Sequence, residues 1–97
     1  MFAIVWRYSV PTEQAPQFVD AYGPAGDWAR LFAMAPGYAG TELIVCDDGT
    51  FVTADRCETR SAFDKFVEVH RVGYDELDQR LASLTTDEAL IGRGEIL

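Results

Sequence analysis

One ionisable side chain in this sequence stands among apolar residues that recur at helical spacing. His70 is the only histidine of the 97 residues. It lies in the stretch 61–84, where apolar side chains recur at steps of three, four and seven residues, which predicts a helix with His70 on its inward face. A neutral imidazole there could take a proton from a phenol, because its ordinary pKa is close to neutrality. The alternative is a partly buried histidine that is hydrogen-bonded to a neighbour.

Three further side chains near this helix carry functional groups. Arg56 could stabilise a phenolate, or could pair with one of the many acids. Tyr74, one helical turn after His70, could hydrogen-bond a ligand or simply pack. Cys57 stands close to a helix start, a position that lowers thiol pKa values. No second histidine or cysteine stands at ligand spacing from His70, so no metal site is expected.

Aromatic residues recur on the faces of the predicted elements. They could form the walls of a pocket for a planar ligand, or they could fill the core and an interface between chains. The candidate wall residues are Trp6, Tyr8, Trp28, Phe32, Phe63 and Phe66.

The pattern of apolar residues, turns and caps predicts six elements in a single domain, residues 1–97. In chain order they are a strand over 2–10, a helix over 12–35, strands over 38–46 and 50–57, a helix over 61–84 and a strand over 89–97. The Gly23-Pro24-Ala25-Gly26 stretch interrupts the first helix, and a bend is expected in the second at Gly73. Asp48-Gly49 is typical of a hairpin turn.

This order predicts an α+β fold with the ferredoxin-like βαββαβ arrangement. Right-handed crossovers would place both helices on one face of a four-stranded antiparallel sheet. The predicted strands are apolar on both faces, however, and no segment remains to cover the second face. We therefore expect a homodimer in which two sheets pack face to face.

Composition and charge exclude several classes of partner. Sixteen acidic residues against eight basic ones give a net charge of −8, which disfavours nucleic acid and anionic membrane surfaces. No apolar run is long enough to span a bilayer, and the start of the sequence has no basic region, so a cytoplasmic location is expected. The predicted hairpin separates Cys46 and Cys57 by about 20 Å, so both are expected as free thiols.

Two stretches of the sequence resemble a known family. Asp55 to Phe63, together with His70 and Tyr74, is similar to the segment around the second helix in the antibiotic biosynthesis monooxygenase-like family, whose members form dimeric α+β barrels. The stretch Tyr22 to Phe32 resembles a subgroup of that family. The resemblance implies a dimer of ferredoxin-like units, each with a pocket between sheet and helices. Some relatives oxidise phenolic or anthrone-type rings with oxygen and without a cofactor, and others bind haem.

The resemblance implies a monooxygenase-like protein for an aromatic or polyketide-type substrate, with no cofactor or metal. His70 would act as the base, and Arg56 or Tyr74 would orient the oxyanion. The chain departs from the family in carrying Cys57 in place of the usual tryptophan and in containing no asparagine. The alternatives are a non-catalytic dimeric module that binds a small hydrophobic ligand, and a haem-binding relative.

Overall fold

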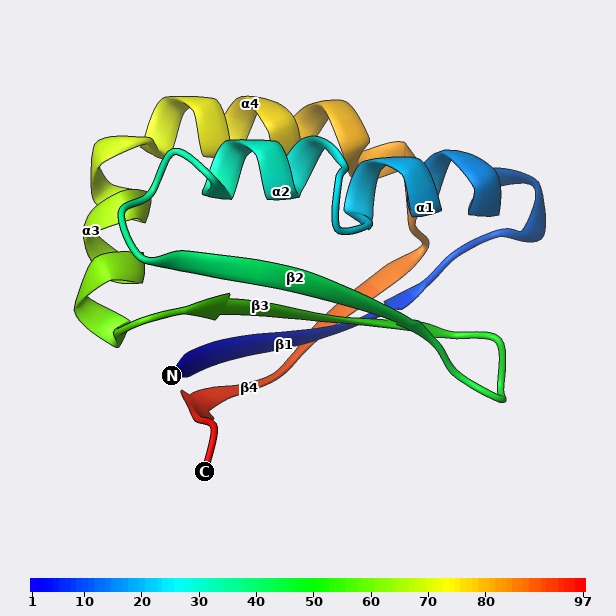
Figure 1. Ribbon diagram of the computed structural model, residues 1–97. Helices are drawn as coiled ribbons and strands as arrows, with labels where there is room; N and C mark the ends of the chain where they lie inside the picture. Colours follow the sequence, from blue (N-terminus) through cyan, green and yellow to red (C-terminus); the bar gives the residue numbers. More distant parts are fainter.

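The computed structural model describes residues 1–97 as a four-stranded antiparallel sheet with every helix on one of its faces (Figure 1). The sheet order is β2-β3-β1-β4, which confirms the predicted ferredoxin-like arrangement. In chain order the elements are β1 (Phe2–Ser9), a 3₁₀ turn (Thr12–Gln14), α1 (Ala15–Tyr22), α2 (Asp27–Phe32), β2 (Tyr38–Val45), β3 (Phe51–Cys57), α3 (Arg60–Val69), α4 (Arg71–Leu81), a second 3₁₀ turn (Ala82–Leu84) and β4 (Asp87–Glu95).

Side-chain alternation along the two central strands separates the faces of the sheet. In β1, Ile4 and Tyr8 are buried beneath the helices, whereas Arg7 is exposed on the opposite face. The antiparallel register pairs Trp6 with Thr53 and Ile4 with Asp55. Because residues paired across two strands share a face, Thr53 and Asp55 also face the helices.

The hairpin between β2 and β3 is one residue longer than the sequence suggested. Val45 pairs with Phe51, and the Cys46 amide donates to the Thr50 carbonyl at 2.8 Å. The two-residue turn at Asp48-Gly49 suggested by the sequence is therefore replaced by a loop of three residues, in which Gly49 adopts a φ of 88° that glycine tolerates. Cys46 and Cys57 are both free.

The first helical stretch is divided as predicted, between α1 and α2. A Cβ atom on Gly26 would lie 2.3 Å from the Asp20 carbonyl oxygen, so the break depends on a residue without a side chain. Asp27 then anchors the restart through two arginines. Its Oδ1 accepts from Arg30 at 3.0 Å, and its Oδ2 accepts from Arg80 of α4, also at 3.0 Å.

The second helical stretch breaks at His70 and not at Gly73. His70 has φ −107° and ψ 26°, which ends α3 and starts α4 at a sharp angle (Figure 1). Thr59 caps the start of α3, and its hydroxyl accepts from the Ala62 amide at 3.1 Å. The apolar stripe continues through the break, since Phe63, Phe66 and Leu77 are all buried.

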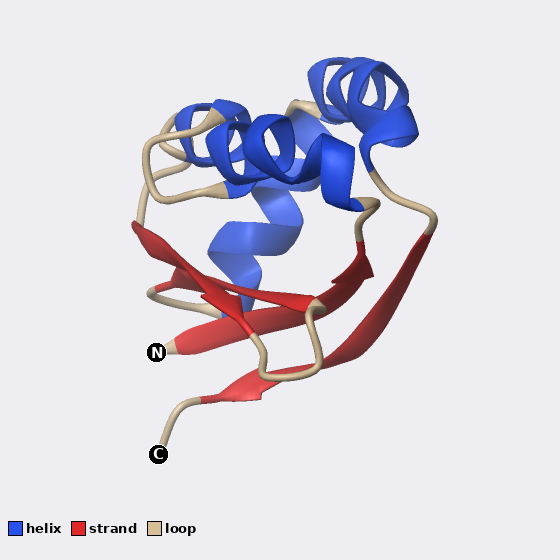
Figure 2. Cartoon of the chain, turned by 90° about the vertical axis from the view of Figure 1, so that its right-hand side faces the viewer, coloured by secondary structure: helices blue, strands red, loops and turns tan.

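The face of the sheet opposite the helices has no cover within the chain (Figure 2). Small and β-branched side chains occupy its central part, among them Ala3, Val5, Val52 and Ala54. Ile44 of β2 is 48% exposed. None of the helices has the length and apolar character needed to span a membrane.

Replacing Gly26 by alanine is expected to lower the free energy of unfolding by about 2 kcal/mol or more, because the new methyl group would overlap backbone carbonyls of α1. Urea unfolding followed by circular dichroism measures the loss. Gly92→Ala is the matched control, since no atom lies within 4 Å of a Cβ built there. Similar stabilities for the two variants would show that the α1–α2 break does not depend on Gly26.

Candidate functional site

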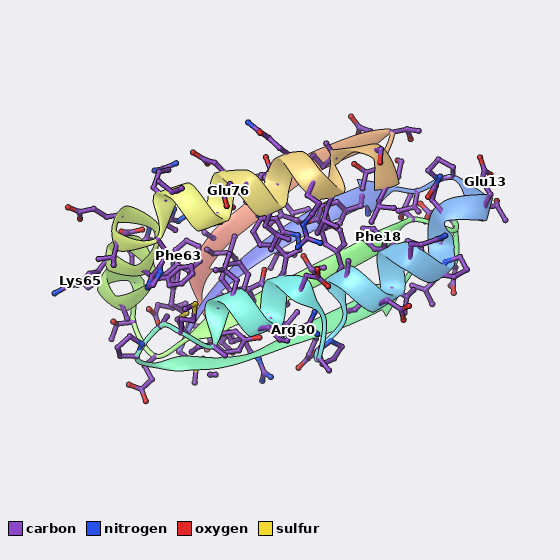
Figure 3. All side chains as sticks on the ribbon, turned by 90° about the horizontal axis from the view of Figure 1, so that it is seen from above. Glu13, Phe18, Arg30, Phe63, Lys65 and Glu76 are labelled. Atoms are coloured by element: carbon purple, nitrogen blue, oxygen red, sulfur yellow. The ribbon has the colours of Figure 1, made fainter.

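A cavity of about 260 Å³ lies between the sheet and the helices. Viewed from the helix side, side chains fill the strip between α4 and the α1–α2 pair, with Phe63 toward α3 and Phe18 toward α1 (Figure 3). The cavity volume of about 260 Å³ lies just below the range of about 300–1,000 Å³ for small-molecule sites, so it suits a small ligand. Its lining residues are Ile4, Trp6, Tyr8, Tyr22, Trp28, Phe32, Thr53, Asp55, Phe63, Tyr74, Asp78 and Glu88.

Seven of these twelve residues are aromatic, and they contact one another around the cavity. The rings of Trp28 and Tyr74 meet edge to face with centroids 4.9 Å apart, which joins α2 to α4. Tyr8 and Tyr22 form a second edge-to-face pair at 5.0 Å. Such pairs hold the rings in fixed orientations, so the wall is set before any ligand enters.

Asp55 provides a carboxyl group on the floor of this aromatic cavity. It pairs with Ile4 of β1 on one side and with Thr41 of β2 on the other, so it occupies the middle of the sheet. The Thr41 hydroxyl donates to Asp55 Oδ1 at 2.7 Å. Burial raises the pKa of Asp55 to about 6, and the bond from Thr41 opposes part of that rise. A carboxyl group with this pKa can exchange a proton near neutral pH.

A second hydrogen bond extends from Thr41 away from the cavity. The hydroxyls of Tyr38 and Thr41 are 2.6 Å apart. Because Thr41 donates its own proton to Asp55, Tyr38 is left to donate to Thr41. The pair fixes the Thr41 rotamer, and Thr41 in turn fixes one oxygen of the Asp55 carboxyl group.

The tyrosines of the cavity remain protonated at physiological pH. Burial raises the pKa of Tyr22 to about 12, and burial likewise raises the pKa values of Tyr8 and Tyr74. Neighbouring acids contribute in the same direction, including Asp78 beside Tyr74. The three phenol groups therefore act as neutral hydrogen-bond donors.

Two buried polar atoms on the cavity wall have no completed hydrogen bond. They are Trp28 Nε1 and Thr53 Oγ1, and Thr53 is only 2% exposed. The Tyr22 hydroxyl lies near Trp28, and the Tyr8 hydroxyl lies near Thr53. Each contact opposes part of the rise in the pKa of its tyrosine, but neither has the geometry of a hydrogen bond. Unpaired buried polar groups are costly, and a ligand with polar atoms could satisfy them.

Six of the residues expected at the site from the sequence do line the cavity. They are Trp6, Tyr8, Trp28, Phe32, Phe63 and Tyr74. His70 lies outside the cavity lining, because the chain turns there and leaves its half-buried ring stacked on Phe66, with ring centroids 4.9 Å apart. Phe66 itself packs in the core against Phe32.

Arg56 also lies away from the cavity. It alternates with Asp55 along β3 and so faces the uncovered side of the sheet, where its Nη1 is 3.6 Å from Glu42 Oε1. The predicted pairing with an acid is therefore present. Neither Arg56 nor His70 can contact a ligand in the cavity, and the geometry gives no support to the catalytic roles expected for them.

The acidic and hydroxyl groups of the site were not expected from the sequence, and the most important of these are Asp55 and Thr53. The signal was present in β3, where Phe51, Thr53, Asp55 and Cys57 share one face by simple alternation. A carboxylate at an inward position of a central strand is rare enough to mark a candidate site.

Several solved structures share this fold along the whole chain. A candidate antibiotic biosynthesis monooxygenase of Nitrosomonas europaea is 17% identical, with a TM-score of 0.72 over 100% of this chain and 99% of that one. A variant of SnoaB, a cofactor-independent oxygenase of Streptomyces nogalater, is 22% identical, with a TM-score of 0.68 over 99% and 95% of the two chains. The protein MhuD, with manganese protoporphyrin IX bound, is 16% identical, with a TM-score of 0.72 over 100% and 95%.

These structures share the fold of the family that the sequence resembles. No family model matches the sequence, and no curated protein is similar to it. At identities of this size the agreement extends to the fold, and the chemistry has to be argued from the residues of the cavity.

We expect Asp55→Asn to stabilise the folded protein above pH 6. The folded pKa of about 6 exceeds the ordinary value of 3.8, so the contribution of Asp55 to stability is complete below pH 3.8 and is lost as the pH rises through 6. Asparagine removes that loss, with a gain at pH 8 of up to about 3 kcal/mol that vanishes toward pH 4. Urea unfolding across this pH range measures it.

The exposed Asp20 on α1 supplies the control for this prediction, as Asp20→Asn. A pH profile that is the same in both variants would contradict the assignment of a perturbed carboxyl group to Asp55.

Proposed function

We propose that this protein binds a small aromatic compound in the cavity and oxidises it with molecular oxygen in a monooxygenase-like reaction, with Asp55 as the base. The observation that supports this most directly is the Asp55 carboxyl group on the floor of a cavity with seven aromatic side chains in its wall. The fold supports it further, since SnoaB, described as a cofactor-independent oxygenase, has the same architecture.

The reaction begins when Asp55 removes a proton from an acidic C–H or O–H group of the bound ring. Its pKa of about 6 makes it a carboxylate at neutral pH and still a stronger base than an ordinary aspartate. Thr41 holds Oδ1 at 2.7 Å, so the second carboxylate oxygen is left for the ligand. The negative charge that develops on the ring oxygen can accept hydrogen bonds from Tyr74, from Tyr22 or from the unpaired Trp28 Nε1.

The substrate itself supplies the electrons for oxygen reduction. The carbanion donates electrons to O₂, a carbon–oxygen bond forms, and the hydroperoxide loses water. A ring CH₂ group thus becomes C=O, one oxygen atom enters the product and the other leaves as water. The four electrons lost by carbon are the four gained by O₂, so no external reductant is needed.

Haem does not fit the residues of this cavity. None of the lining residues is histidine, lysine or arginine, so the cavity offers no imidazole to ligate iron and no cation to pair with the two propionates. Asp55, Asp78 and Glu88 would face those carboxylates as like charges. The sole histidine lies outside the cavity, and no step of the reaction is assigned to haem.

Oxygen uptake with an anthrone-type compound tests the role of Asp55. We expect Asp55→Asn to lower the rate by about 100-fold or more, the usual contribution of a general base. His70→Ala is expected to react at the wild-type rate, because His70 does not reach the cavity. Equal rates for wild type and Asp55→Asn would remove Asp55 from the mechanism. Saturable binding without oxygen uptake would favour the non-catalytic binding module instead.

We further propose that two copies of the chain associate through the uncovered face of the sheet. Val5, Val52 and Ala54 form the centre of that face, and Ile44 leaves 48% of its surface exposed beside them. Apolar side chains at the centre of a sheet face are seldom left in water, and a second copy presents a matching surface of the same shape.

Sedimentation analysis tests the dimer at micromolar concentration. Wild type should sediment at twice the 10.8 kDa chain mass, and Ala54→Arg should sediment as a monomer, because a buried charge without a partner opposes association. Val72→Arg on the exposed surface of α4 is the control and should remain dimeric. A monomeric wild type would overturn this proposal.

A further inference from the structure

The charges around the cavity are of one sign. Three of its twelve lining residues are acids, Asp55, Asp78 and Glu88, and none is basic. No salt bridge involves any of these three carboxyl groups, although Arg30, Arg80 and Arg93 pair with acids elsewhere on the surface. The site therefore keeps its negative charge uncompensated within the chain.

The acids at the cavity mouth also repel one another. Burial raises the pKa of Glu88, and the nearby carboxylates of Asp78 and Asp87 raise it further. A positively charged group placed among them would relieve this repulsion.

The aromatic wall offers a second favourable surface for a cation. The faces of tryptophan and tyrosine rings attract ammonium groups, and an aromatic enclosure is a common way to bind amines. Trp6, Trp28 and Tyr74 come from three different elements and meet at this cavity. Beside them Thr53, which is 2% exposed, has an unpaired hydroxyl that can accept a hydrogen bond from an N–H group.

The adjoining groove differs in charge. It shares Ile4, Trp6, Phe63 and Tyr74 with the cavity but is also lined by Arg71 and Arg93, together with Asp64 and Glu68. Arg93 is already engaged, since it donates to Asp64 at 2.7 Å and lies over the Phe2 and Phe63 rings. An anionic substituent would thus have Arg71 as its unpaired partner in the groove and would meet only acids in the cavity.

We propose that the ligand of this cavity is an arylalkylamine, an aromatic ring with an aliphatic amino group, whose protonated nitrogen lies among the rings and the carboxylates of Asp78 and Glu88. This inference deepens the proposed function, because it rests on the same cavity being the ligand site, but it does not depend on the oxidation step. It identifies the substrate class as cationic and aromatic, in contrast to a neutral or acidic ring.

Three isosteric probes test the inference by isothermal titration calorimetry at pH 7.5. They are 2-naphthylmethylamine, 2-naphthylmethanol and 2-naphthoate, which differ in charge and little in shape. We expect the amine to bind at least about tenfold more tightly than the alcohol, the size of a partly desolvated ammonium–aromatic contact with added charge attraction. The carboxylate should bind most weakly.

A pair of double variants separates the local charges from the net charge. Asp78→Asn with Glu88→Gln should abolish most of the preference for the amine over the alcohol. Asp75→Asn with Glu76→Gln removes the same charge from exposed positions of α4 outside the cavity and should keep the preference. Circular dichroism confirms that both variants are folded.

The outcomes distinguish this inference from the proposed reaction. A preference for the alcohol or the carboxylate, equal losses in the two double variants, or no binding of the amine would overturn the inference, even if anthrone-type rings are oxidised. Selective amine binding in a protein that consumes no oxygen would support the inference and remove the oxidation.

Discussion

The buried carboxyl group of Asp55 limits how the side chains above the sheet can pack. It occupies the middle of the sheet, between Ile4 and Thr41, and burial raises its pKa to about 6. Its hydrogen-bond partner within the chain is the Thr41 hydroxyl at 2.7 Å. A carboxyl group so placed cannot be surrounded by tightly packed apolar side chains without being neutralised. An open cavity above it is the arrangement that keeps it accessible to a proton donor.

Two breaks in the helical layer produce that cavity. The Gly23–Gly26 stretch separates α1 from α2, and the turn at His70 separates α3 from α4. The turn at His70 gives α4 a new direction relative to α3 (Figure 1), and Tyr74 of α4 contacts Trp28 of α2 with ring centroids 4.9 Å apart. The contact between Arg80 and Asp27 at 3.0 Å then holds α2 beside α4.

The fold could be predicted from the sequence because its main signals are local. Strand alternation and the Gly23-Pro24-Ala25-Gly26 stretch each act within a few residues, and both were identified correctly. The turn at His70 was not predicted, because no glycine or proline stands there and the helical spacing of apolar residues continues from α3 into α4. The sole histidine led to a prediction of catalytic residues on that helix. Simple alternation of side chains along β3, by contrast, puts Asp55 on the inward face of the sheet beside Thr53.

The uncompensated charge of the cavity is informative because it lowers stability. A buried acid without a basic partner and a mouth with mutually repelling carboxylates both oppose folding. The chain has eight basic residues, and it uses Arg30 and Arg80 around Asp27 and Arg93 on Asp64, all outside this cavity. Residues that lower the stability of the protein without its ligand are expected at sites where binding or catalysis requires them. The charge pattern therefore favours a site that is completed by a ligand of opposite charge, since packing alone would have favoured apolar residues there.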